Sequence, residues 1–252
     1  MARVPVGLQM YTVRDDAARD FVGTLKRVAD LGYAGVELAG TGGLAARELR
    51  KVLDDLGLRV AGSHVGMEQL EGELAAALDY AAEIGNANVV CPYIGEERRK
   101  DADGYRRLAD QFNRIGLACK ARGMTFSYHN HAFEFERFGD LTGLEILFGA
   151  TDPTLVKSEL DVYWIQYGGE DPVAFIAKLA GRVPLVHLKD MADNESRSFA
   201  EIGEGMLDWH AICSAAEQAG AEWFLVEQDV CKRPPMESAE LSLRNLRSMG
   251  LA

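Results

Sequence analysis

Eight consecutive residues, 128–135, concentrate groups that coordinate metal ions and transfer protons. Their sequence, YHNHAFEF, contains two of the five histidines of the 252-residue chain, together with an asparagine and a glutamate. Imidazoles and carboxylates serve both as ligands of divalent metals and as general acids and bases. Crowded polar groups cost stability unless each finds a partner or a ligand. The role of this segment therefore depends on which other polar residues the fold brings beside it.

Helix and strand patterns alternate along the whole chain. Residues 20–31 place apolar residues on one helix face, end at a glycine, and are followed by the apolar run AGVELAG. The same glycine punctuation returns five more times, and each glycine is suited to a left-handed helix stop before the next strand. The six glycines are Gly32, Gly57, Gly85, Gly123, Gly181 and Gly220.

Eight segments have the composition of buried strands, and amphipathic segments separate them. They are VGLQMYT (6–12), GVELA (35–39), RVAGSHV (59–65), NVVCPY (88–93), TFSYHNH (125–131), LVKSELD (155–161), PLVHLK (184–189) and WFLVEQD (223–229). Eight alternations without a strand-only block predict an α/β fold, a (β/α)8 TIM barrel that forms a single domain over residues 1–252. A doubly wound open sheet is the alternative. No strand is followed by GxGxxG, which disfavours a dinucleotide-binding fold.

Strand periodicity assigns the polar residues to one end of this barrel. Alternate residues of a closed parallel barrel face the helices, where they must be apolar, and the others face the barrel axis. Val186 and Leu188 then face the helices, so His187 and Lys189 face the axis. By the same rule, the following residues also face the axis: Glu37, His64, Ser127, His129, His131, Glu159, Asp161, Glu227 and Asp229. Four of the five histidines and several carboxylates are thus predicted at the carboxyl end of the barrel, where barrel enzymes keep their catalytic groups.

Such a collection of side chains indicates a metal site. Carboxylates and imidazoles that converge in a low-dielectric mouth repel one another or stay unsatisfied without a cation, whereas a divalent metal neutralises them at ligand distances of about 2.0–2.2 Å. Asp161, His187 and Glu227, at the ends of three successive strands, are the strongest ligand candidates. A mixed nitrogen and oxygen set without thiolate indicates Mn²⁺, Mg²⁺, Co²⁺ or Zn²⁺, with Mn²⁺ as our first expectation.

A set of short motifs also carries a family resemblance over essentially the whole chain. The motifs are GLQMYTVR, YHNHAFEF, SELD, VHLKD, GEGMLDW and LVEQD. As a set they resemble the sugar phosphate isomerase/epimerase group of xylose isomerase-like TIM barrels, which includes inosose dehydratases, inosose isomerases and ketose 3-epimerases. The resemblance implies one metal ion held by residues from strands five to eight, with Asp161, His187 and Glu227 in the matching positions.

The ligand from the fifth strand departs from that family pattern. Direct strand matching places His129 where the epimerases have a glutamate, while Glu134 follows in the next loop. We predict Glu134 as the fourth ligand, with His129 and His131 near the substrate. This departure weakens the expectation of a simple two-glutamate epimerase mechanism.

The predicted reaction is proton abstraction next to a carbonyl group. A metal ion bound to the carbonyl and an adjacent hydroxyl stabilises the enediolate, and a nearby carboxylate or imidazole takes the proton. Return of the proton to the other carbon isomerises the substrate, and return to the opposite face epimerises it. We predict an isomerase or epimerase of a sugar or cyclitol in which Glu227 and either Glu134 or His129 share the acid–base work.

Four further residues are predicted to contact the substrate. They are Glu37, His64, His131 and Lys189. His64 and Lys189 would bind or polarise substrate oxygens, and Glu37 would orient a hydroxyl or a neighbouring histidine. For Lys189 a structural ion pair with Asp190 or Glu159 is an equally good interpretation.

Three other functions are compatible with a polar barrel mouth. A dehydratase or lyase acting on a keto-inositol or a 3-keto-glycoside would use the same metal, with the extra histidines as acids for the leaving group. A phosphodiesterase of the endonuclease IV type would need a larger histidine-rich cluster and a basic face, and the net charge of −12 disfavours nucleic acid as a partner. A non-catalytic sugar-binding protein would not need a complete ligand set.

The composition of the chain also limits the expected location and partners of the protein. The longest apolar runs are a few residues, so no membrane-spanning segment is predicted, and MARVPVGLQM lacks the pattern of a secretory signal. Four cysteines at wide spacings suit reduced thiols in a cytoplasmic protein. The expected partner is a small sugar or cyclitol, and the family resemblance allows a homodimer.

Overall fold

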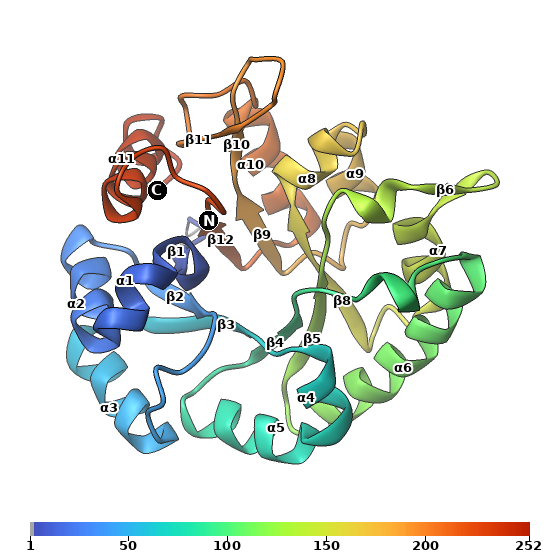
Figure 1. The fold of residues 1–252 in the computed structure, drawn as a ribbon, viewed down its shortest axis with the longest axis horizontal. Helices are drawn as coiled ribbons and strands as arrows, with labels where there is room; N and C mark the ends of the chain where they lie inside the picture. The colour runs from blue at the N-terminus through green and yellow to red at the C-terminus, as the bar shows by residue number, and fades with distance from the viewer. Residues whose placement is uncertain (1–2) are drawn as a thin grey trace.

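The structure, a computed structural model, describes residues 3–252 and contains a closed eight-stranded parallel barrel (Figure 1). The strands are β1 (Val6–Gln9), β2 (Gly35–Leu38), β3 (Arg59–His64), β4 (Asn88–Cys91), β5 (Thr125–His129), β8 (Val156–Asp161), β9 (Leu185–Leu188) and β12 (Trp223–Val226). Strand β1 pairs with both β2 and β12, which closes the sheet. The predicted TIM barrel is therefore confirmed, and the open doubly wound sheet is wrong.

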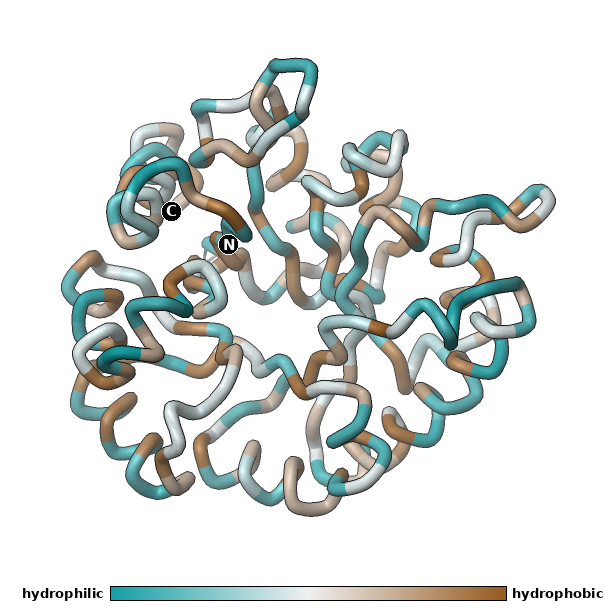
Figure 2. The backbone as a smooth tube through the Cα atoms, in the orientation of Figure 1, coloured by the Kyte–Doolittle hydropathy of each residue, from teal (hydrophilic) through white to brown (hydrophobic). Residues whose placement is uncertain are grey.

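Helices surround the barrel on its outside (Figure 1). They are α1 (Arg14–Arg19), α2 (Phe21–Leu31), α3 (Ala46–Leu56), α4 (Met67–Gly72), α5 (Leu74–Glu83), α6 (Ala102–Lys120), α7 (Gly143–Ala150), α8 (Val162–Tyr167), α9 (Pro172–Lys178), α10 (Trp209–Ala219) and α11 (Pro235–Ser248). Figure 2 shows short hydrophilic and hydrophobic stretches alternating along several of them, as expected for helices that bury one face.

Local signals in the sequence explain where these helices begin and end. Helix α2 begins where the Asp20 side chain accepts a hydrogen bond from the Gly23 amide, and it ends at Gly32, whose φ is 91°. Glycine adopts this left-handed conformation without the clash that a Cβ atom would cause. The five other glycines predicted as helix stops also have positive φ values.

Short strands and 3₁₀ turns lie in the loops at the carboxyl end of the barrel. Two antiparallel pairs lie in its loops, β6 (Arg137–Phe138) with β7 (Leu141–Thr142) and β10 (Asp190–Met191) with β11 (Phe199–Ala200). Single 3₁₀ turns follow three of the strands, η1 (Met10–Val13), η2 (Glu96–Arg98) and η3 (Phe133–Phe135). These loops follow the carboxyl ends of β1, β4, β5 and β9.

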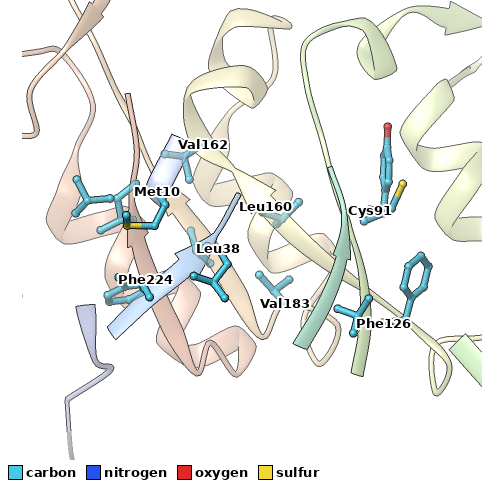
Figure 3. Close-up of a cluster of buried hydrophobic side chains, with 14 of the residues drawn as sticks. Met10, Leu38, Cys91, Phe126, Leu160, Val162, Val183 and Phe224 are labelled. Carbon is cyan, nitrogen blue, oxygen red and sulfur yellow. The ribbon is translucent and has the colours of Figure 1, made fainter. Parts of the chain in front are cut away.

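The apolar core is divided by the barrel wall. Residues that point outward from the strands pack against the helices in one large cluster, part of which Figure 3 shows around Leu38, Phe126, Leu160 and Phe224. Phe112 of α6, for example, packs its ring 5.2 Å from that of Phe126. The predicted inward and outward alternation along the strands is confirmed by this packing.

A second, smaller apolar cluster fills the barrel interior at the amino end of the strands. Its buried members are Ala61, Val90, Leu185, Trp223 and Leu225. The Arg59 guanidinium lies 4.4 Å from the centre of the Trp223 ring. Leu185 and Leu225 lie two residues before His187 and Glu227, so the same strand faces become polar only towards their carboxyl ends.

Two features bear on the predictions about membrane-spanning segments and about the cysteines. Within residues 3–252 no helix combines the length and hydropathy that crossing a bilayer requires. The four cysteines are all free, and three of them are buried.

Candidate active site

The carboxyl ends of the barrel strands bring the predicted inward residues into one buried network. It contains Glu37, His64, His129, Glu159, Asp161, His187, Lys189 and Glu227. All of them except His64 are buried, and His64 retains a side-chain exposure of 12%. The period-two rule therefore placed these side chains correctly, from strands that are far apart in sequence.

His187 lies at the centre of the network. Its Nδ1 is 2.8 Å from an oxygen of Glu227, and its Nε2 is 2.7 Å from an oxygen of Glu37. The Nε2 atom is also 3.2 Å from Glu159 Oε2. Burial lowers the pKa of His187, but attraction to the three surrounding carboxylates outweighs it and holds the pKa well above its usual value.

Lys189 supplies the positive charge on the rim side of this network. Its Nζ lies 2.8 Å from one carboxylate oxygen of each of Asp161, Glu227 and Asp229. Burial lowers the pKa of the ammonium, but these three anions raise it well above its usual value. The structural interpretation of Lys189 as a partner of Asp190 or Glu159 is therefore wrong, because the side chain points to the ends of β8 and β12 instead.

Asp190 has a separate task, which sequence reasoning missed. Its carboxylate accepts hydrogen bonds from the amides of Gly203 and Gly205 and from the indole of Trp209. A Cβ atom on Gly205 would lie 2.2 Å from Asp190 Oδ1, so the close approach requires glycine. The motifs VHLKD and GEGMLDW are thus joined by a buried carboxylate that holds the loop before α10 over the rim.

The fourth member of the predicted ligand set is His129 in this geometry. One donor atom from each of His129, Asp161, His187 and Glu227 lies within 4.8 Å of the others, and no group of this kind in residues 3–252 includes Glu134. The structure therefore places Glu134 outside the candidate ligand groups and does not support our prediction of Glu134 as the fourth ligand. Strand matching, which put His129 at the glutamate position of the epimerases, agrees with the observed arrangement.

Glu134 is turned away from the network for a local reason. It lies on η3, where its carboxylate accepts hydrogen bonds from the Tyr128 hydroxyl and from the His131 amide, the latter at 2.8 Å. Tyr128 belongs to the outward face of β5, because its ring packs against Phe112 in the helix layer. Burial raises the pKa of Glu134 to about 7.

Each polar residue of YHNHAFEF now has a distinct position. His129 enters the network, and Glu134 supports the loop from the helix side. Asn130 joins β5 to β8, since its side chain accepts from the Asp161 amide at 3.0 Å and donates to the Asp161 carbonyl at 3.3 Å. This pair of bonds fixes the end of β8, where the Asp161 carboxylate must be held.

His131 lies on the rim instead of among the candidate ligands. Its ring stacks on Phe133, with centroids 5.3 Å apart, and lies 5.7 Å from the ring of Trp164. Burial lowers the pKa of His131 to about 2, so the imidazole is neutral. Its Nδ1 and the Trp164 Nε1 are both buried without a hydrogen-bond partner, which suits a ligand with hydroxyl groups.

Gln9 is a member of the site that sequence reasoning overlooked. Its side-chain amide donates to Glu37 at 2.7 Å and lies 3.3 Å from a ring nitrogen of His64. The available signal was its inward parity, since Gln9 is the direct register partner of Glu37. Glutamine was not singled out because it neither titrates nor commonly binds metals.

The donor atoms present fit a divalent cation. Two buried carboxylate oxygens, Glu37 Oε1 and Glu159 Oε1, accept no hydrogen bond. Unsatisfied anionic oxygens in a buried site are costly, and a hard or borderline cation removes that cost. Imidazole nitrogens and carboxylate oxygens without thiolates are the ligands expected for Mn²⁺, Mg²⁺, Co²⁺ or Zn²⁺.

Comparison with known proteins agrees with the fold. A curated inosose dehydratase from Clostridium beijerinckii is 26% identical over 87% of this chain and 86% of its own length, and one from Lacticaseibacillus casei is 31% identical over 54% and 52%. The structure of a sugar phosphate isomerase/epimerase from Parabacteroides distasonis superposes with a TM-score of 0.85, at 28% identity over 100% of this chain and 96% of that one. The family model for the xylose isomerase-like TIM barrel matches residues 25–249. The chain therefore belongs to the xylose isomerase-like TIM barrel family, and it is an enzyme.

Proposed function

We propose that this enzyme is a divalent-metal-dependent dehydratase or lyase of a keto-cyclitol or keto-sugar. It removes a proton next to the carbonyl group and then expels a β-hydroxyl or another β-substituent. The observation that carries the proposal is the buried cluster of His129, Asp161, His187 and Glu227, whose donor atoms lie within 4.8 Å of one another. The curated relatives named inosose dehydratase support the choice of reaction.

The metal ion would be held by His129, Asp161, His187 and Glu227. When bound, it supplies Lewis-acid polarisation of the substrate carbonyl, which acidifies the neighbouring C–H group. Mn²⁺ is our first choice, and Mg²⁺, Co²⁺ and Zn²⁺ use the same kinds of ligand. Asn130 and Glu37 act indirectly, because Asn130 holds the backbone of Asp161 and Glu37 fixes the ring of His187 through its Nε2.

Glu227 is the residue that we assign to proton transfer. Burial alone would raise the pKa of its carboxyl group, but Lys189 and His187 hold it well below its usual value, so the group is ionised and able to accept a proton. The proton from the substrate carbon passes to Glu227 and is returned to the departing hydroxyl. The C–H and C–O bonds break, a carbon–carbon double bond forms beside the carbonyl, and water leaves.

Lys189 and the rim residues bind the substrate in this proposal. The ammonium group of Lys189 is fixed by three carboxylates and stabilises negative charge that develops on a substrate oxygen. His131 is neutral and offers hydrogen bonds to hydroxyl groups, as does the indole of Trp164. The pKa of His131 is too low for it to act as the acid that protonates the leaving group.

An isomerase or epimerase of a sugar or cyclitol is the second candidate. The full-length similarity to the Parabacteroides distasonis sugar phosphate isomerase/epimerase favours it, and its first step is the same proton abstraction. A 3-epimerase of the two-glutamate type needs a second carboxylate facing Glu227 across the substrate. The expected carboxylate, Glu134, points to Tyr128 instead, and this difference places elimination first.

The test follows both reactions in one experiment. The Mn²⁺-loaded protein is incubated in heavy water with a panel of inososes, 3-keto-glycosides and ketoses. A dehydratase or lyase gives loss of water or of the aglycone with a new ultraviolet absorption band. An isomerase or epimerase instead places solvent deuterium next to the carbonyl without loss of a substituent.

Variants tie the result to the site. Asp161→Asn and Glu227→Gln should abolish turnover and lower the metal content, whereas Asp103→Asn, at an exposed carboxylate on α6, should change neither. If both site variants keep the metal content and the exchange rate of the wild-type protein, the assignment of the site is wrong.

A further inference from the structure

A cavity of about 330 Å³ lies beside the polar network, between the carboxyl ends of β2 and β3 and the helices α4 and α5. His64 lines this cavity and also contacts Glu159 of the network at 2.9 Å, so the cavity and the candidate active site meet at the His64 imidazole. Neither His64 nor the cavity takes part in the proton transfer proposed above. Both are therefore available to bind a part of the substrate away from the reacting carbons.

The walls of this cavity are mostly apolar. Leu38, Val65 and Ile84 contribute aliphatic side chains. Ala77 and Ala81 of α5 are small enough to leave the space open. Among residues 3–252, no Asp, Glu, Lys or Arg lines it. Such walls favour a ligand group with apolar surface, because removal of that surface from water stabilises the complex.

The polar groups of the cavity are few, and two of them already have partners. The Ser63 hydroxyl accepts a hydrogen bond from the Asn86 side chain at 2.7 Å. The Tyr80 hydroxyl donates to the Leu44 carbonyl at 3.0 Å. A free sugar or cyclitol has a hydroxyl group on almost every carbon, and hydroxyls buried here without partners would weaken binding. The cavity therefore suits a different part of the substrate from the polar ring that faces the candidate ligands.

The cavity lies in the half of the barrel mouth that does not supply the candidate ligands. Those ligands come from the ends of β5, β8, β9 and β12, which are consecutive neighbours in the closed sheet. The cavity borders β2 and β3, which belong to the other four strands. A substrate whose carbonyl group faces the ligands therefore extends towards β2 and β3, and a substituent on its far side reaches the cavity.

We propose that the substrate is a keto-glycoside whose apolar aglycone, an alkyl or aryl group joined through oxygen, lies in this cavity. The inference rests on the proposed elimination and specifies the β-substituent that leaves. The C–H bond next to the carbonyl and the C–O bond to the aglycone break, and the C–H electron pair forms the carbon–carbon double bond. The proton passes through Glu227 to the aglycone oxygen, which leaves as an alcohol or a phenol.

The volume of the cavity sets the size of this aglycone. An apolar cavity of roughly 150 Å³ holds one benzene molecule. At about 330 Å³ this cavity has room for a substituted six-membered ring or for two fused rings. His64 lies at the junction of the cavity and the network, which is where the sugar ring would meet the aglycone.

The test compares two substrates whose leaving groups differ in size but not in chemical type. Methyl and cyclohexyl 3-keto-glycosides of the same sugar both release a simple alcohol, so the acidity of the leaving group does not separate them. One methylene group in an apolar pocket changes kcat/KM by about 10- to 200-fold. With the Mn²⁺-loaded protein, we therefore expect kcat/KM for the cyclohexyl substrate to exceed that for the methyl substrate at least about a hundredfold.

Variants on α5 connect this preference to the cavity. Ala77→Leu fills part of the space and should reduce the preference at least about tenfold, through a higher KM for the cyclohexyl substrate. Ala76→Leu adds the same bulk at a more exposed position of the same wall, where folding tolerates it, and should act in the same direction. Ala82→Leu is the matched control, since Ala82 is exposed on α5 outside the cavity, and it should keep the wild-type ratio.

Binding of the released alcohol gives a readout that does not depend on turnover. Saturation transfer measured by NMR from the protein to the ring protons of cyclohexanol should occur with the wild-type protein and with Ala82→Leu. The transfer should be lost or reduced with Ala77→Leu. Equal transfer in all three proteins would place the alcohol outside the cavity and overturn the assignment.

The outcomes separate this inference from the proposed function. Equal kcat/KM for the two glycosides, or a preference that neither Ala77→Leu nor Ala76→Leu reduces, would overturn the role of the cavity and leave the elimination intact. Loss of water from inososes without elimination from either glycoside would overturn the keto-glycoside substrate alone. Absence of elimination from every inosose and keto-glycoside would overturn both proposals.

Discussion

The two ends of the barrel interior are built from the same strands with opposite chemistry. At the amino end, Leu185 and Leu225 belong to an apolar cluster closed by Trp223. Two residues later on the same strand faces, His187 and Glu227 belong to a buried ionic network. On one strand face, residues that stabilise the barrel therefore lie only two positions from residues that serve chemistry at a cost in stability.

The largest effect should follow from damage to the polar end alone. Asp161→Asn removes one anionic ligand but keeps an oxygen able to accept from the Trp164 amide, as Asp161 does at 3.0 Å. We expect turnover to fall at least about a thousandfold, as for loss of a metal ligand or a main electrostatic group. Thermal unfolding of the metal-free variant should match that of the metal-free wild-type protein. A large loss of stability with normal turnover would reverse the assigned roles of the two ends.

A smaller effect, on stability and not on turnover, should follow from a substitution at the apolar end. Leu225→Ala opens a cavity at a side chain that is fully buried inside the barrel. The free energy of unfolding should fall by about 2–5 kcal/mol, the range found when a buried leucine is replaced by alanine. Denaturant unfolding measures this change, while turnover per folded molecule and metal content should stay at the wild-type level. Loss of bound metal in this variant at full folding would show that the two ends are coupled.

The smallest effect concerns Glu134, which is polar and buried but lies outside the network. Because burial raises its pKa to about 7, the folded protein favours the protonated form, and the contribution of Glu134 to stability is lost as the pH rises from about 4.5 through 7. Glu134→Gln removes this titration. The stability of the variant relative to the wild-type protein should therefore rise by roughly 2–3 kcal/mol between pH 4.5 and 7.5. Unfolding curves over this pH range measure the difference, and a flat difference would show that Glu134 titrates normally.

The sequence was most informative where the backbone is regular. Period-two alternation along β9 and β12 was sufficient to point His187 to the axis, and the same alternation continued one residue past each strand pointed Lys189 and Glu227 there too. The glycine stops were equally clear, since Gly32 and Gly57 adopt φ values that other residues avoid. Both kinds of inference need only the residues nearby in sequence, once the barrel fold has been predicted.

The errors lie where the backbone leaves the strand. Glu134 follows β5 by five residues, and no periodicity predicts whether a carboxylate on a 3₁₀ turn points to the axis or to the helix layer. The hydrogen bond from the Tyr128 hydroxyl holds the Glu134 carboxylate on the side of the helix layer. The partners of Lys189 were also missed, since neighbours in sequence such as Asp190 were preferred to Glu227 and Asp229 from the next strand.

The sequence alone therefore determined the fold, the axis-facing residues and the presence of a cluster suited to a cation. The tertiary structure alone decided which carboxylates meet which nitrogens, such as the contacts of His187 with Glu227 and Glu37. The reason is physical. Strand geometry is local and repeats along the chain, whereas contacts across the barrel depend on register between distant strands and on side-chain rotamers, which no local pattern encodes.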